Sequence, residues 1–172
     1  MPSRHSSPGF TLLELLVVIS IIGLLSSFLV ASLSQARAKA RDTRRKAELR
    51  SMQTALELYF NDNNGYPVAP GWLSSEPGDG PPAPGDYIPG LVPAYMARLP
   101  RDPLGGPSHI NPPCGPPWKR AYVYYSPDGL NYSLLAHCSA EGPMSPDDAF
   151  YDPNRPTWAW KVCSGELACS NW

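Results

Sequence analysis

The sequence predicts an α+β fold in which one long N-terminal α-helix packs on a small antiparallel β-sheet. Residues 10–33 carry no charge except Glu14, and residues 35–62 contain neither proline nor glycine. All but two of the 22 prolines lie from Pro67 onward, where they exclude long helices. We therefore expect continuous helix in the first third of the chain and loops with short strands in the rest.

The first half of the predicted helix, residues 10–33, is apolar enough to span a membrane. At about 1.5 Å per residue, these 24 residues cover a hydrocarbon core of about 30 Å. A cleaved secretory signal is a competing interpretation, but its apolar region has only about 7–15 residues. The A-x-A matches that follow lie in a basic stretch, residues 36–40. Residues 10–33 are accordingly predicted to be a transmembrane helix.

The second half, residues 34–64, is predicted to be the amphipathic continuation of the same helix. Good helix formers dominate it, and Gly65 and Pro67 end it. Asp42 and Lys46 are spaced for an ion pair on a solvated face. Apolar side chains recur every three or four residues and form one stripe that needs a packing partner, namely Leu49, Met52, Leu56, Tyr59 and Phe60.

Residues 65–172 are predicted to form a head of proline-rich loops and a small β-sheet. A short helical turn is expected at residues 91–99. Two aromatic and aliphatic runs flank the turn sequence of residues 126–129, which predicts a β-hairpin. A third strand is expected at residues 157–163, where large apolar residues alternate with others.

The four cysteines all lie in this head. An even number of cysteines beyond an apolar segment indicates an oxidising compartment and two disulfides. Four cysteines allow three pairings, of which we favour Cys163 with Cys169, and Cys114 with Cys138. Four reduced, partly buried thiols are the alternative.

Charge and motifs exclude some classes of function. The net charge is −1, but residues 67–172 hold six basic and ten acidic residues. Such a head gains nothing from counterion release, so we expect no nucleic-acid binding by it. The chain has no nucleophile elbow, phosphate-binding loop or zinc-protease motif. The sequence therefore predicts a protein that is not an enzyme.

Glu14 is the most informative single residue. A carboxylate at the centre of a bilayer costs about 2.5–3.5 kcal/mol, and less near the end of a span. Glu14 is therefore either a tolerated acid in a signal anchor or a functional residue. Cleavage after Gly9 would give Phe10 a new α-amine, which could meet Glu14 of another subunit. Such a pair neutralises two charges only on assembly, and it would set the register of the subunits.

Residues 9–18, GFTLLELLVV, resemble the class III signal of type IV prepilins and type II secretion pseudopilins. The resemblance implies that residues 1–9 are a leader peptide, removed by a prepilin peptidase between Gly9 and Phe10. It also implies N-methylation of Phe10 and a role for Glu14 in assembly and registration.

Three later blocks, residues 55–67, 91–106 and 122–136, are similar to those of the G-type major pseudopilins. They imply a type IV pilin-like fold and a structural subunit of a helical filament for protein secretion. The implied partners are other copies of the chain, the prepilin peptidase, the inner-membrane assembly platform and minor pseudopilins. A type IV pilin for adhesion, twitching or DNA uptake is an alternative, which the cysteines favour. A monomeric, signal-anchored binding domain is a second alternative.

The resemblance also implies a location, in which the chain crosses the inner membrane once and later enters the filament. The positive-inside rule would place the basic residues 37–50 in the cytoplasm. The cysteines and the processing signal instead place the head on the periplasmic or extracellular side, and we follow them.

A calcium site is the one cofactor that the resemblance suggests. G-type pseudopilins are associated with calcium in the acidic loop after the last matching block. Here His137 and Cys138 stand where acid and glycine are expected. Asp147, Asp148 and Asp152 are the candidate oxygen ligands, with simple solvated acids as the alternative.

Overall fold

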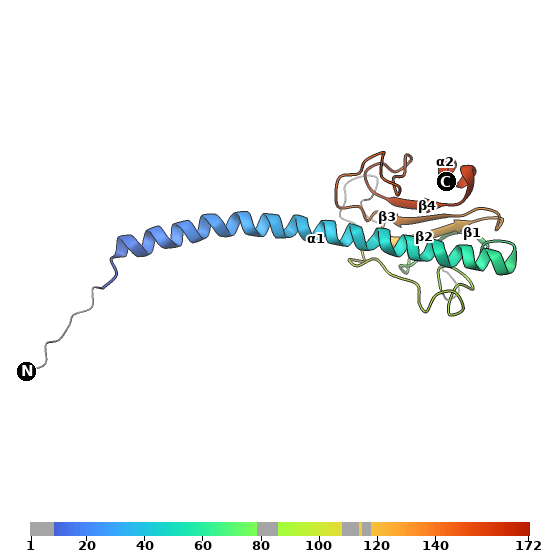
Figure 1. Ribbon diagram of the computed structural model, residues 1–172, viewed down its shortest axis with the longest axis horizontal. Helices are drawn as coiled ribbons and strands as arrows, with labels where there is room; N and C mark the ends of the chain where they lie inside the picture. The colour runs from blue at the N-terminus through green and yellow to red at the C-terminus, as the bar shows by residue number, and fades with distance from the viewer. Residues whose placement is uncertain (1–8, 79–85, 108–113, 115–117) are drawn as a thin grey trace, which may run out of the picture. The chain divides into compact units, whose positions relative to one another are not determined.

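The protein has the predicted α+β fold, with one long helix and a four-stranded antiparallel sheet (Figure 1). The computed structural model describes residues 9–78, 86–107, 114 and 118–172, so most of the predicted leader lies outside the described residues. The elements are α1 (Leu12–Asn63), β1 (Ala69–Ser74), β2 (Ala121–Ser126), β3 (Ser133–His137), β4 (Trp160–Cys163) and α2 (Gly165–Asn171).

The chain divides into two compact units, Met1–Arg37 and Ala38–Trp172. In the first unit, the described residues consist mainly of the apolar beginning of α1. The most apolar 18-residue window of this helix has a mean hydropathy of 2.6, and none of that window is buried. By length and composition alone, α1 is able to cross a membrane.

The second unit is built on the sheet, whose strand order is β1-β2-β3-β4. The predicted hairpin is confirmed as β2 and β3, which pair from Ala121–His137 to Tyr125–Ser133. Strand β1 was not predicted, because Pro70 and Gly71 lie inside it. An edge strand tolerates such residues, and the register of β1 against β2 shifts between Ala69 and Leu73.

The predicted apolar stripe packs on the sheet and forms the core of the second unit. Leu49, Met52 and Leu56 are 0 % exposed, and Tyr59 and Phe60 pack against the same core while partly exposed. Alternate residues of the strands face the helix, as the period of two in a strand requires. They are Tyr122, Tyr124, Leu134, Ala136, Trp160 and Val162.

The predicted turn at residues 91–99 is present, since the N–H of Tyr95 donates to the carbonyl of Leu91. One local prediction needs correction: the last strand begins only at Trp160, because residues 156–158 form a turn instead of extended chain. Between the last two cysteines lies the short helix α2, which begins after Ser164.

Candidate assembly site and its head domain

Three hydrogen bonds between Thr11 and Glu14, in both directions, fix the N-terminus of α1. The main-chain N–H and the hydroxyl of Thr11 donate to one oxygen of Glu14, at 3.0 and 2.8 Å. In return, the N–H of Glu14 donates to the Thr11 hydroxyl at 3.2 Å. This is a capping box, in which each residue satisfies an N–H that the first turn leaves without a partner. Glu14 therefore holds the start of the helix as well as carrying a charge.

The side chains around this capping box are apolar and exposed. Phe10 is 86 % exposed, and it lines a hollow of about 280 Å³ together with Leu13, Glu14, Val17 and Val18. Further along α1 the same exposure continues on every side of the helix. A helix that is apolar all round needs lipid or other protein around it. Among the described residues, the apolar side chains of the first unit find no partner that buries them.

The head is tied to α1 by a cluster of ion pairs that we call the Arg45 cluster. It consists of Arg41, Asp42, Arg45, Asp102 and Glu141. The Arg45 side chain is fully buried and donates two hydrogen bonds to the Asp102 carboxylate, of 2.7 and 3.0 Å. It also donates hydrogen bonds to Asp42 at 2.9 Å and to Glu141 at 2.6 Å. The more exposed Arg41 donates to Glu141 as well.

These contacts favour the charged forms of Asp102 and Glu141. Burial would raise the pKa of Asp102, but the bonds and charge of Arg45 and the N–H of Leu104 lower it below its ordinary value. The pKa of Glu141 is lowered in the same way: burial would raise it, but the bonds and charges of Arg41 and Arg45 have the larger effect. Burial favours the neutral form of Arg45, yet its three acidic partners raise its pKa.

Sequence reasoning missed this cluster and placed Asp42 wrongly. We expected Asp42 to pair with Lys46 on a solvated face, but Asp42 is only 6 % exposed. It pairs with Arg45 and accepts the N–H groups of residues 141 and 142, while Lys46 pairs with Asp148. The spacing 42–45–49–52–56 continues the apolar stripe, and this spacing was the signal that would have placed Asp42 and Arg45 inside.

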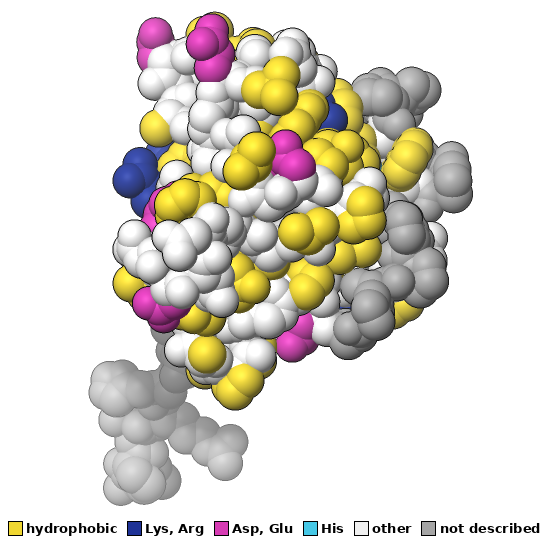
Figure 2. Space-filling view, turned by 90° about the vertical axis from the view of Figure 1, so that its right-hand side faces the viewer, with side chains coloured by type: hydrophobic (Ala, Val, Ile, Leu, Met, Phe, Trp, Pro, Cys, Tyr) yellow, Lys and Arg dark blue, Asp and Glu magenta, His cyan; other side chains and the backbone are white. Residues whose placement is uncertain are grey.

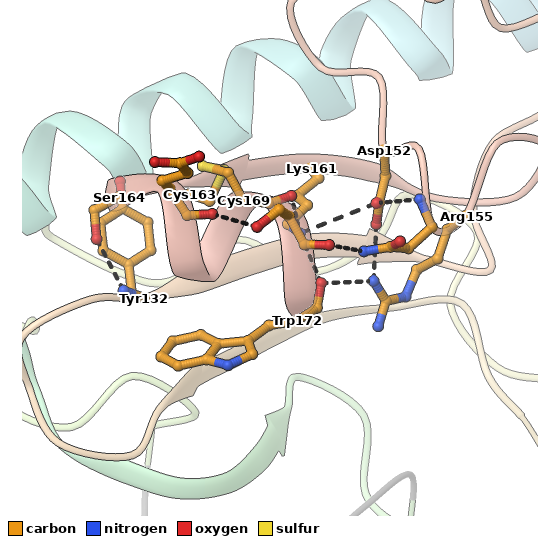
Figure 3. Close-up of a disulfide and its surroundings, with 11 residues drawn as sticks. Tyr132, Asp152, Arg155, Lys161, Cys163, Ser164, Cys169 and Trp172 are labelled. Carbon is orange, nitrogen blue, oxygen red and sulfur yellow. Dashed lines mark hydrogen bonds and ion pairs between the residues drawn. A yellow bond between two sulfur atoms is a disulfide. The ribbon is translucent and has the colours of Figure 1, made fainter.

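The disulfides have the pairing that the sequence favoured. Cys114 bonds to Cys138 and Cys163 to Cys169, and no described cysteine is free. The second disulfide joins the end of β4 to α2. The carbonyl of Cys169 in α2 accepts a hydrogen bond from the buried amine of Lys161 at 3.0 Å (Figure 3). The oxygen of Trp172 accepts from the same amine at 2.6 Å. Burial lowers the pKa of Lys161, with Arg155 adding to the effect and Asp152 opposing it.

The residues proposed for calcium do not fit a metal ion. Asp148 pairs with Lys46. Partial burial would raise the pKa of Asp148, but Lys46 and the N–H of Phe150 lower it below its ordinary value. Asp152 accepts from Arg155 at 2.9 Å and lies 4.0 Å from the amine of Lys161, as Figure 3 shows. Asp147 is exposed. Among the described residues, no three acids, histidines or cysteines are grouped so that they could hold a metal.

Comparison with known proteins agrees with this geometry. The prokaryotic N-terminal methylation motif matches residues 4–30, which include Gly9, Phe10 and Glu14. A type II secretion system core protein G of Aeromonas hydrophila is 36 % identical over 115 residues, which cover 66 % of this chain and 78 % of that protein. The chain belongs to the type II secretion system core protein G family.

Other members of the core protein G family cover more of the chain. That of Escherichia coli K12 is 32 % identical over 150 residues, 86 % of this chain and 92 % of its own. The Dickeya chrysanthemi protein is 35 % identical over 125 residues, 71 % of this chain and 78 % of its own. No solved structure gives a significant match. The protein is thus a structural subunit of the pseudopilin kind, and its apolar N-terminal helix fits a membrane anchor.

Proposed function

We propose that the protein is the filament subunit of a type II secretion pseudopilus. A prepilin peptidase cuts it after Gly9 and methylates Phe10. Residues 10–33 first anchor it in the inner membrane, and residues 34–64 and 65–172 form the exposed part of the subunit. An assembly platform then moves it into a filament whose centre is made of the apolar helices. The protein acts as a structural element and not as a catalyst.

The single observation that carries this proposal is the apolar first unit with a capped acid at its start. Its side chains are exposed in the isolated chain, with Leu16 59 % and Phe28 69 % exposed. Association of such helices removes this surface from lipid or water, and apolar packing between neighbours supplies cohesion. The methylation motif and the relatives support the same reading.

Glu14 has two separable roles in the proposal. Its capping bonds with Thr11 start the helix within one chain. Its charge is costly in lipid, and the α-amine of Phe10 in a neighbouring subunit offsets it after cleavage. A subunit therefore gains from leaving the membrane only when another subunit is in register beside it.

The test separates charge from capping. Glu14→Gln keeps an acceptor oxygen for Thr11 but removes the charge, whereas Thr11→Ala removes a capping partner and keeps the charge. We expect Glu14→Gln to be inserted in the membrane yet to give no filaments in a shear-and-sediment assay. Thr11→Ala should still assemble, at reduced yield. Normal filaments from Glu14→Gln would show that the charge has no role in assembly.

A further inference from the structure

A hollow of about 480 Å³ lies on the head beside the second half of α1. Its apolar lining includes Phe150, Tyr151, Pro153, Val162 and the Cys163–Cys169 disulfide. Its polar lining consists of Arg50 and Gln53 from α1 and Lys161 from β4. The hollow belongs entirely to the second unit.

Arg50 gives this hollow an unbalanced charge. Its guanidinium lies 5.1 Å from the centre of the Phe150 ring, and its side chain is exposed. Among the residues that the structure describes, no carboxylate lies within ion-pair distance of it. Lys46, one turn earlier, is paired with Asp148. Lys161, the other cation of the lining, donates to the carbonyl of Cys169 and the oxygen of Trp172. The hollow therefore combines apolar side chains with a cation, Arg50, that lacks an ion-pair partner, which suits a large apolar side chain next to a carboxylate.

The turn between β2 and β3 presents that combination. Leu130 is 67 % exposed although it is a large apolar residue, and Asp128, two residues before it, is exposed as well. No basic side chain of the described chain pairs with Asp128. Figure 2 shows the side of the molecule that faces right in Figure 1, where apolar side chains lie among separate acids and basic side chains are sparse.

The turn is held rigidly in this conformation. The N–H of Tyr66 donates to the carbonyl of Gly129 at 2.7 Å, and the N–H of Leu130 donates to Asp128 at 2.9 Å. Gly129 has φ of 73°, and a Cβ there would lie 3.0 Å from the carbonyl oxygen of Tyr66, so only glycine fits without strain. Because the turn is ordered in advance, its binding costs little conformational entropy.

The turn and the hollow are different patches of one subunit. The turn is bonded to the chain just beyond the end of α1. The hollow extends from Arg50 and Gln53 to the Cys163–Cys169 disulfide, whose neighbour Ser164 bonds to Tyr132 after the turn. Two different, complementary patches on one chain make a head-to-tail contact, which repeats into rings or open helical filaments.

We propose that the β2–β3 turn of one subunit docks into this hollow on the next subunit. Leu130 enters the apolar part, and Asp128 pairs with Arg50 of the neighbour. The contact lets the heads set the direction in which subunits add, whereas the apolar helices supply most of the cohesion. This inference rests on the proposed function, since it concerns contacts within the same filament.

A charge exchange tests the proposal in cells that assemble the wild-type filament. Arg50→Asp and Asp128→Arg should each reduce sedimentable filaments by about tenfold or more, because each places like charges together in the contact. The double variant should recover at least half of the wild-type amount. Leu130→Ser should reduce assembly as well. Asp86→Arg, a charge reversal at another exposed acid, and Leu104→Ser, at another exposed leucine, are the matched controls and should assemble normally.

Each outcome has one meaning. Processing should be unchanged in all variants, and thermal unfolding of the detergent-solubilised chain should be unchanged in Arg50→Asp and Leu130→Ser, so their loss of filaments reports the contact. Asp128→Arg also loses the bond from the N–H of Leu130, so for this variant the recovery in the double variant reports the contact. Single variants that assemble normally, or a double variant that stays as defective as Arg50→Asp, would overturn the docking. If Arg50→Asp alone is defective, the hollow holds another partner and the proposal is wrong. Wild-type protein that forms no filament would instead contradict the proposed function.

Discussion

The two halves of α1 are continuous helix, yet they obtain their packing from different sources. In residues 12–37 large apolar side chains are exposed, as Leu16 is at 59 %. In residues 38–63 one stripe packs on the sheet, and its Leu56 is 0 % exposed. A buried leucine contributes about 1.5–3 kcal/mol of stability, so the second half folds with its own head. The first half must find lipid or other subunits, which is why one chain can be an anchor and then a filament subunit.

The polar residues of the two halves differ in the same way. Among the described residues, the Glu14 side chain bonds only to Thr11 of its own first turn, so its charge remains open to a partner outside the chain. Arg45, in contrast, pairs with three acids within the second unit. Assembly and head stability are therefore separable, and single substitutions can affect one without the other.

The largest effect on the head is expected from Arg45→Met. The substitution leaves Asp42 and Asp102 buried without their cation and leaves Glu141 with Arg41 alone, and breaking such a buried pair costs about 3–5 kcal/mol. Denaturant unfolding of the full chain in detergent should show this loss. Arg37→Met, at an exposed arginine of the first unit, is the control and should leave the unfolding transition where it was. Equal unfolding midpoints for the two variants would remove the distinction between the halves.

A pair of leucine substitutions sharpens the comparison. Leu56→Ala should destabilise the head by about 2–5 kcal/mol, because it opens a cavity in the core. Leu16→Ala should leave thermal unfolding of the head unchanged and lower the yield of sedimentable filaments. Both are measured on the same preparations. A drop in the unfolding temperature of Leu16→Ala would mean that the first half is packed within its own chain.

The smallest of these effects is the response of the head to acid. The folded pKa values of Asp102 and Glu141 lie below their ordinary values of 3.8 and 4.5. Their contribution to stability is therefore complete above those values and is lost as the pH falls through the lower folded ones. Thermal unfolding followed from neutral pH to about pH 3 should show a falling midpoint. In Arg45→Met the fall should be shallower, since the cation that lowers both pKa values is gone.

Sequence reasoning was most accurate where one physical signal dominates. The uncharged run predicted the apolar helix, and the stripe from Leu49 to Phe60 predicted the face that packs on the sheet. The hairpin followed from two strong strands around a turn. These signals are local, so they can be read without knowing which distant residues meet.

The missed features depend on contacts between distant parts of the chain. Strand β1 forms despite Pro70 because its neighbour β2 is available to pair with it. Asp102 becomes a buried partner of Arg45 only because its loop folds back on α1. Two of the acids suggested for calcium, Asp148 and Asp152, are paired with Lys46, Arg155 and Lys161, of which only Arg155 is a near neighbour in sequence. The sequence therefore predicted the apolar helix and its packing face, but not the ion pairs that hold the head.

The central claim is that the chain is cut after Gly9 and then leaves the membrane for a filament. The intact mass of the protein, purified from the membranes of cells with its own secretion genes, tests that claim most directly. The account predicts a mass that lacks residues 1–9 and carries one added methyl group, located on Phe10 by fragmentation. An intact, unmethylated chain in cells that contain an active prepilin peptidase would contradict it and would favour a monomeric anchored protein.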